Sequence, residues 1–197
     1  MRGDALAALV GSRICHDLIS PLGAIGNGVE LLELSGAPEG PELSLIGESV
    51  QSANARIRFF RIAYGIASEG TEIGRSEVAG TLASVARGGR LSYFWEVEGD
   101  QPRREVRAVF LILQCLESAM PFGGDIHVRR DGARWAVRAE ADRTRVEAPL
   151  WDSLTNPRAR VEVTAGQVQF AMLPEVMREL GREMRVETGE TEISVGF

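Results

Sequence analysis

The stretch SRICHDLISPLG, residues 12–23, lies within a longer segment whose apolar residues recur at steps of three or four. These apolar residues are Leu6, Val10, Ile14, Leu18, Leu22, Ile25, Val29 and Leu32. The spacing predicts an amphipathic helix over residues 4–34, with Asp4 as a suitable N-cap. Pro21 lies inside this helix, although a proline in a helix interior costs roughly 3 kcal/mol. The segment therefore combines a strong helix pattern with a residue that disturbs it, close to His16.

A second helix is expected after the turn SGAPEGP, residues 35–41. Its apolar positions alternate steps of three and four, as in a heptad seam, and they are Leu43, Ile46, Val50, Ala53, Ile57, Phe60, Tyr64 and Ala67. Two helices joined by a short loop pack antiparallel. A lone hairpin cannot cover so continuous an apolar stripe, whereas two hairpins related by a two-fold axis can, as a four-helix bundle. We therefore expect residues 1–70 to form a homodimer; the alternative is that the rest of the chain covers the hairpin.

His16 falls on the opposite side of the first helix from the apolar stripe, at about 100° per residue, and is expected to face solvent. The residues that share this face are Ser12, Arg13, Ser20, Gly23 and Asn27. Pro21 leaves the carbonyl group of Asp17 without its helical donor, so the helix should bend just after the histidine. Because most residues on this face are small, the face leaves room for another protein to lie across it.

The remaining part of the chain, residues 76–197, alternates helix and strand patterns. Helices are expected over 76–86, 103–121 and 166–181, and strands over 90–99, on both sides of the Asp131-Gly132 turn, and around Gly189-Glu190. Pro174 should interrupt the last helix, and Gly181 suits its C′ position. Helices on one side of a mostly antiparallel sheet form an α+β sandwich. The expected fold class is therefore α+β, with a helical hairpin followed by an α/β sandwich domain.

Composition restricts the classes of partner. The formal net charge is −6 and the sequence pI is near 5.1, which argues against nucleic acid or an anionic membrane as the main partner. The N-terminus lacks the pattern of a signal peptide, and no stretch of about 18 apolar residues exists, so we expect a cytoplasmic protein. Cys15 and Cys115 both fall in apolar helical segments, where buried free thiols are expected.

The motif H-D-L-I-S-P-L, residues 16–22, resembles the phosphoacceptor box of histidine kinases, in which an acid, Ser or Thr, and Pro follow the histidine. The hairpin is similar to their dimerisation and phosphotransfer domain, and residues 76–197 are similar in order and length to their ATP-binding domain. The departures lie in the second part. Ser118 replaces the Asn that helps hold Mg-ATP, the segment EADRTR keeps Asp142 but neither glycine of the nucleotide loop, and Gly166 alone persists near the last helix. Side chains obstruct the close backbone approach that phosphates need, so ATP should bind poorly.

A phosphoacceptor histidine without a working ATP site resembles the ChpT family of alphaproteobacterial histidine phosphotransferases. The resemblance implies a dimer that passes phosphoryl groups from the receiver domain of a hybrid histidine kinase to response regulators. It implies that His16 carries the phosphoryl group and that the protein has no cofactor of its own, since the receiver supplies Mg²⁺. Arg13 is placed to neutralise the phosphoryl charge and Asp17 to orient or deprotonate the imidazole. The residues expected to contact the receiver are Ser12, Ser20, Gly23 and Asn27.

Two other functions stay open on the sequence. One is an ATP-dependent histidine kinase with a divergent nucleotide site. The other is a regulatory dimer that binds receivers and carries no phosphate.

Overall fold

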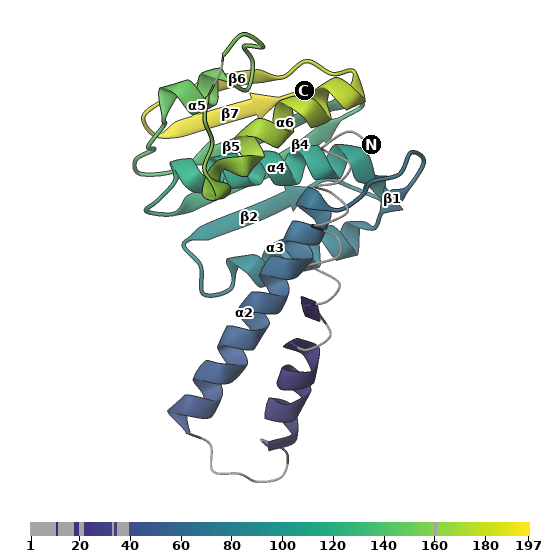
Figure 1. Ribbon diagram of the computed structural model, residues 1–197, viewed down its shortest axis with the longest axis vertical. Helices are drawn as coiled ribbons and strands as arrows, with labels where there is room; N and C mark the ends of the chain where they lie inside the picture. The colour runs from purple at the N-terminus through teal and green to yellow at the C-terminus, as the bar shows by residue number, and fades with distance from the viewer. Residues whose placement is uncertain (1–10, 12–17, 20–21, 33, 35–39, 160) are drawn as a thin grey trace.

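The computed structural model describes residues 11, 18–19, 22–32, 34, 40–159 and 161–197. The described residues between 11 and 34 are helical and run antiparallel to α2 (Pro41–Tyr64), so the expected hairpin is present (Figure 1). Close approach of the two helices is fixed by small residues: a Cβ placed on Gly26 would lie 3.5 Å from Val50 Cγ1, and one on Gly47 would lie 3.6 Å from Val29 Cγ1. Val29 and Val50 are accordingly the buried residues of this contact.

Much of the apolar stripe of the hairpin is exposed in the single chain. Four large apolar side chains of the expected stripe face solvent there, and they are Leu18, Ile25, Leu32 and Ile46; Leu31, Leu34 and Leu45, which lie off the stripe, are exposed as well. All of them lie in the part of the hairpin that projects from the rest of the chain (Figure 1). Among the described residues of the hairpin, these stripe side chains are therefore left uncovered by the rest of the chain.

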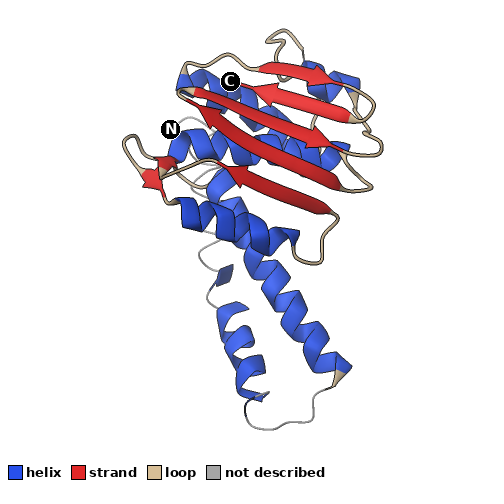
Figure 2. Ribbon diagram, turned by 180° about the vertical axis from the view of Figure 1, so that it is seen from behind, coloured by secondary structure: helices blue, strands red, loops and turns tan. Residues whose placement is uncertain are grey.

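The remainder of the chain folds as a five-stranded sheet with the order β2-β4-β5-β7-β6. The strands are β2 (Leu91–Glu96), β4 (Gly124–Asp131), β5 (Arg134–Glu140), β6 (Arg185–Thr188) and β7 (Glu192–Gly196). β2 and β4 are parallel and the other neighbours are antiparallel. The helices are α3 (Arg75–Ala86), α4 (Arg103–Ala119), α5 (Ala148–Asp152) and α6 (Val168–Leu180), and they cover one face of the sheet while the other face stays open (Figure 2).

The core lies between the sheet and α4. Along β5 every second residue is buried, and on β4 the alternate residues Ile126 and Val128 are buried, as expected for a sheet with one covered face. α4 is buried along most of its length, from Val106 to Ala119. Three residues near the end of α2, Phe59, Ile62 and Ala63, belong to the same buried cluster. The base of the hairpin is thus packed into the core of the C-terminal region.

The expected helices over 76–86 and 103–121, the strand over 90–99, and the strands on both sides of Asp131-Gly132 and of Gly189-Glu190 are confirmed. The first of these two turns contains Gly132, whose φ is 55°. The expected interruption at Pro174 is wrong: α6 continues through it and ends at Gly181, which adopts the left-handed conformation with φ 65°. A proline removes one helical hydrogen bond, and the buried neighbours Phe170, Leu173 and Met177 hold the helix in place regardless. The sequence did not predict α5, nor the short strands β1 (Glu72–Ile73) and β3 (Gln101–Pro102), which pair with each other.

The second helix ends earlier than its apolar pattern, at Tyr64. A Cβ placed on Gly65 would lie 2.2 Å from the Arg61 carbonyl oxygen, so only glycine permits the chain to leave the helix there. Among the described residues, no helix is long and apolar enough to cross a membrane.

Candidate functional site

Most residues of the expected phosphoacceptor site lie outside the described part of the chain. These are His16, Asp17, Arg13, Ser12 and Ser20, together with Pro21 and Cys15. Gly23 and Asn27 are described: both are helical, with Gly23 half-buried and Asn27 exposed. A Cβ placed on Gly23 would meet no atom within 4 Å. The helix surface is therefore open at Gly23.

The side chain at the position that matches the kinase Asn is hydrogen-bonded within its own helix. Ser118 is exposed near the end of α4, and its hydroxyl donates to the Cys115 carbonyl oxygen at 2.6 Å. Cys115 itself is a buried free thiol, as predicted, and burial raises its pKa. A serine hydroxyl bonded to its own helix lacks both the reach and the amide oxygen that a metal-holding Asn offers.

The loop that matches the kinase nucleotide loop is fastened to the protein. The backbone N–H of Arg145 donates to the Ala119 carbonyl oxygen at 2.7 Å, so the loop closes directly on the end of α4. Thr144 donates from its backbone to Glu190 at 2.7 Å and from its hydroxyl to the Gly189 carbonyl oxygen at 2.6 Å. Asp142 is exposed. Backbone N–H groups that a phosphate-binding loop would turn toward a ligand are thus used within the protein.

α5 occupies space beside α6 on the same side of the sheet. Its Trp151 is buried and packs edge-to-face on Phe170 of α6, with the ring centroids 5.6 Å apart. Gly166 lies in a short 3₁₀ turn, residues 165–167, just before α6. A Cβ placed on Gly166 would lie 4.0 Å from Thr164 Oγ1, an ordinary distance, so this position does not require glycine. The surviving glycine therefore does not reproduce a phosphate cradle.

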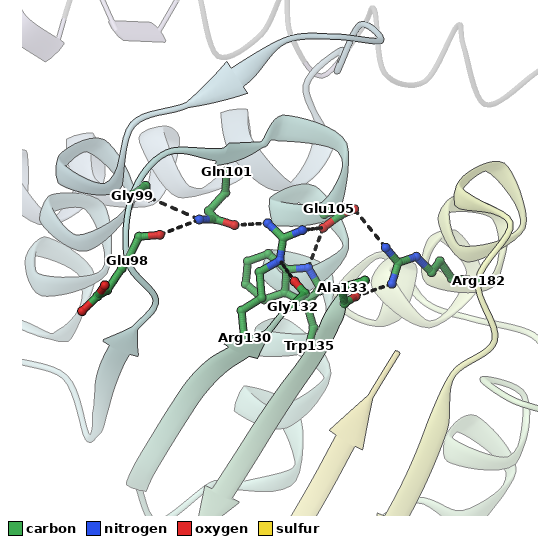
Figure 3. Close-up of polar contacts among 9 residues, drawn as sticks. All are labelled: Glu98, Gly99, Gln101, Glu105, Arg130, Gly132, Ala133, Trp135 and Arg182. Atoms are coloured by element: carbon green, nitrogen blue, oxygen red, sulfur yellow. Dashed lines mark hydrogen bonds and ion pairs between the residues drawn. The ribbon is translucent and has the colours of Figure 1, made fainter.

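A polar cluster that the sequence did not reveal lies at the start of α4 (Figure 3). The Glu105 carboxylate accepts from Trp135 Nε1 at 2.7 Å, and pairs with Arg130 at 3.1 Å and with Arg182 at 3.2 Å. The Arg130 guanidinium also donates to Gln101 and lies 5.1 Å from the centroid of the Trp135 ring. Each charged group in Figure 3 that faces the cluster has a partner, so we interpret the cluster as structural. Its members are far apart in sequence and no local pattern marks them.

His127, the second histidine, lies on β4 at the open face of the sheet. Its Nδ1 is 2.6 Å from Glu96 Oε1, and its ring stacks on Phe94 with the centroids 4.5 Å apart. Hydrogen bonds from Arg129 and then from His127 hold the pKa of the Glu96 carboxyl below its usual range. This arrangement matches the expectation of a structural or solvated residue.

Comparison with known proteins places the chain in a family. A family model described as the histidine phosphotransferase C-terminal domain matches residues 75–192. The chain is 40% identical over 130 residues to the protein phosphotransferase ChpT of Brucella abortus (strain 2308), and the matched region is 65% of this chain and 62% of that protein. The match thus spans less than two thirds of that relative's length. A 1.7 Å structure of a bacterial phosphotransferase covers 100% of this chain and 97% of its own, with 28% identity and a TM-score of 0.71.

The region matched by the family model begins with α3 and extends into β7, and it contains the closed loop, α5 and the polar cluster described above. The resemblance inferred from the phosphoacceptor box and from the order of elements over residues 76–197 is thereby supported. This chain belongs to the histidine phosphotransferase family.

Proposed function

We propose that the protein is a histidine phosphotransferase of a bacterial phosphorelay, which carries a phosphoryl group on His16 between receiver-domain aspartates. The observation that carries the proposal is the match of residues 75–192 to the family's C-terminal domain, directly after a helical hairpin that bears the motif H-D-L-I-S-P-L. The family member ChpT is a protein phosphotransferase, which supports the same activity here.

The proposed chemistry is two successive transfers. A neutral imidazole nitrogen of His16 attacks the phosphorus of a receiver acyl phosphate; the N–P bond forms, the O–P bond breaks, and the aspartate leaves as a carboxylate. The second transfer reverses these steps on another receiver. Covalent relay divides one difficult transfer into two easier ones, and an exposed histidine is largely neutral above about pH 6.5.

Positioning and charge neutralisation dominate such transfers. In the proposal the receiver brings Mg²⁺, Arg13 neutralises developing phosphoryl charge, and Asp17 orients the imidazole. Gly23 and Asn27 belong to the surface that the receiver covers, with Ser12 and Ser20. The open strip beside Gly23 supports this assignment, because a receiver can approach the helix closely there.

ATP is not a substrate in this proposal. The support is the closed loop at Thr144 and Arg145, the self-bonded hydroxyl of Ser118, and the ordinary environment of Gly166. A kinase would need backbone N–H groups and a metal-holding side chain at these places.

The proposed functional unit is a cytoplasmic homodimer whose partners are receiver domains of a hybrid kinase and of response regulators. The exposed stripe residues Leu18, Ile25, Leu32 and Ile46 support the dimer, because an exposed apolar face marks an interface. Pairing two hairpins in a four-helix bundle would bury them.

Incubation with a phosphorylated receiver tests the proposal. We expect label to appear on the protein, to pass to a second receiver, and to be absent from His16→Ala, which still binds receivers. Labelling of His16 by ATP and Mg²⁺ alone would favour a divergent kinase. Equal relay by His16→Ala would favour a regulatory dimer that carries no phosphate.

A further inference from the structure

One face of α4 contacts α2. The residues Arg107, Phe110, Gln114 and Glu117 follow one another at steps of three, four and three, which places them on one side of the helix. Arg107 donates to the Ala63 carbonyl oxygen at 3.3 Å, and Phe110 packs on Phe59 with the ring centroids 4.7 Å apart. The hairpin is therefore bound along a row of side chains and not by its linker alone.

The far end of the row is an ion pair between Arg56 and Glu117. Arg56 Nη1 donates to Glu117 Oε2 at 3.0 Å, and Arg56 Nη2 donates to Glu117 Oε1, so the guanidinium and the carboxylate meet side by side. The hydrogen bond to Glu117 raises the pKa of the Arg56 guanidinium above its usual value. Two parallel hydrogen bonds restrict the mutual orientation of the groups more than a single point contact does. This pair thus fixes an angle as well as a distance between α2 and α4.

The ion pair is not a by-product of dense packing. The Arg56 and Glu117 side chains are 40% and 30% exposed, and both line a cavity of about 290 Å³ together with Arg90, Tyr93 and Met120. At this level of α2 a polar contact spans the space between hairpin and domain.

Tyr64 contacts the same row of α4 side chains. Its hydroxyl donates to Gln114 Oε1 at 2.5 Å, and burial raises its pKa to about 12. A Cβ placed on Gly11 would lie 3.6 Å from Tyr64 Cβ, so Gly11 lies beside this residue. Tyr64 therefore contacts the domain through its hydroxyl and lies beside Gly11 of the N-terminal segment.

We infer that the Arg56–Glu117 pair and the Tyr64–Gln114 contact are positioning elements that hold the C-terminal domain at one angle to the hairpin, so that a receiver meets a preformed surface made by both. This inference rests on the proposed function, since it assigns these side chains a role in phosphoryl transfer. A surface that is already ordered saves the free energy of ordering at each encounter, which favours binding. An ATP-binding domain that delivers phosphate to a histidine has to move relative to that histidine. A domain fixed in this way does not move, and it only contributes surface to the contact with the receiver.

Hydrogen exchange measures the attachment itself and does not depend on any phosphotransfer activity. In Arg56→Glu, where two carboxylates face each other, we expect faster exchange in α2 residues 50–58 and in the end of α4, with exchange in β4 and β5 unchanged. The charge-swapped protein Arg56→Glu/Glu117→Arg is expected to restore slow exchange. Arg129→Ala, which breaks an ion pair with Glu96 on the open face of the sheet, is the matched control and leaves α2 unchanged.

Transfer kinetics measure the positioning. For Arg56→Glu we expect the receiver concentration at half-maximal transfer to rise about tenfold, equivalent to about 1.4 kcal/mol, with the maximal rate changed less. Phosphorylation of His16 by phosphoramidate, a small donor that needs no docking, is expected to stay the same. The charge-swapped protein should recover most of the affinity, and Tyr64→Phe should show a smaller effect in the same direction.

The outcomes separate this inference from the proposed function. Transfer by the unchanged protein with no loss in Arg56→Glu would overturn the inference alone, as would unchanged hydrogen exchange in that variant. An equal loss with phosphoramidate, or failure of the charge swap to restore transfer, would also overturn it, because both point to general damage. Absence of transfer in the unchanged protein would overturn the proposed function, and with it the assigned role.

Discussion

The two ends of α2 have different surroundings. At the base, Phe59 has no exposed surface and packs on Phe110 within the core of the C-terminal domain. At the tip, Leu45 is 64% exposed, and its neighbour Ile46 also faces solvent. The buried Phe59 lies off the expected seam, whose Phe60 is 37% exposed. An apolar period in a helix therefore does not by itself indicate which side is buried or what covers that side. Here the base is covered by the chain itself, and the tip is left for a second copy in our proposal.

The strongest test of the base removes its central ring. Phe59→Ala should lower the free energy of unfolding by about 3–5 kcal/mol, because a fully buried aromatic side chain is lost and a cavity remains. Denaturant unfolding followed by tryptophan fluorescence measures this loss. The adjacent Phe60→Ala, at a partly exposed position, should cost less than half as much. Equal losses would mean that the two rings are not distinguished by burial.

The tip is tested through the oligomeric state. Ile46→Glu should weaken dimerisation about 100-fold or more, because each protomer would place a carboxylate in the apolar seam. Sedimentation velocity over a range of concentrations measures the dissociation. Ser44→Glu adds the same charge at an exposed position outside the seam and should leave the dimer intact. If Ile46→Glu also unfolded the C-terminal domain, the tip and base would not be separate.

Gly65 marks the point where the base of α2 leaves the helix. Gly65→Ala should lower the free energy of unfolding by about 1–3 kcal/mol, since its Cβ would overlap the Arg61 carbonyl oxygen and the backbone must shift. Thermal unfolding of the two proteins side by side measures the change. A neutral result would show that the exit from α2 has another allowed path.

The tyrosines report on the base by pH, because both tyrosines of the chain, Tyr64 and Tyr93, lie there. Burial raises both pKa values, to about 12 for Tyr64. A phenol with a pKa near 10 in the unfolded chain and a higher one in the folded protein contributes stability that is complete below about pH 10 and is lost as the pH rises toward 12. Absorbance at 295 nm should show no phenolate up to about pH 10 in the folded protein.

The variant Tyr64→Phe identifies which part of this titration belongs to Tyr64. It should remove the component near pH 12, leave that of Tyr93, and cost about 1 kcal/mol through the lost hydrogen bond to Gln114. Titration of either tyrosine at its ordinary pKa in the folded protein would contradict the burial of the base.

The smallest expected effect has the opposite sign and lies in the projecting part of the hairpin. Gly28 is exposed and helical, and a Cβ there would meet no atom within 4 Å. Gly28→Ala should therefore raise the free energy of unfolding of the hairpin by about 0.5–1 kcal/mol. Circular dichroism during thermal unfolding measures it. A loss of stability would show that the partner protomer approaches this glycine.

Long elements with a clear period could be predicted from the sequence. α4 follows from its apolar run, and the pair β4–β5 follows from alternation around Gly132. Short elements could not: α5 has five residues, and what makes it a helix is the burial of Leu150 and Trp151 against α6. Pro174 misled the prediction because tertiary packing around α6 outweighs one missing hydrogen bond.

In the candidate site, too, a contiguous motif could be predicted from the sequence, whereas contacts between distant residues could not. The phosphoacceptor box is a contiguous motif and was identified from its residues, and it stays a prediction for His16 and its neighbours. Arg56 and Glu117 are 61 positions apart, and nothing in either local sequence pairs them. Contacts that depend on how two helices meet are invisible to a one-dimensional pattern, even when each helix is predicted correctly.

The length of α2 determines how its base, which is packed in the C-terminal domain, is oriented relative to its tip. The helix is 24 residues long, and each inserted residue would turn its tip by about 100° and move it by about 1.5 Å. A single insertion near its middle would therefore rotate the seam at Ile46 away from its partner, while the base stayed in the domain. An insertion of seven residues would return the seam to within about 20° of its original direction. We expect natural length variation in this helix to come in multiples of seven.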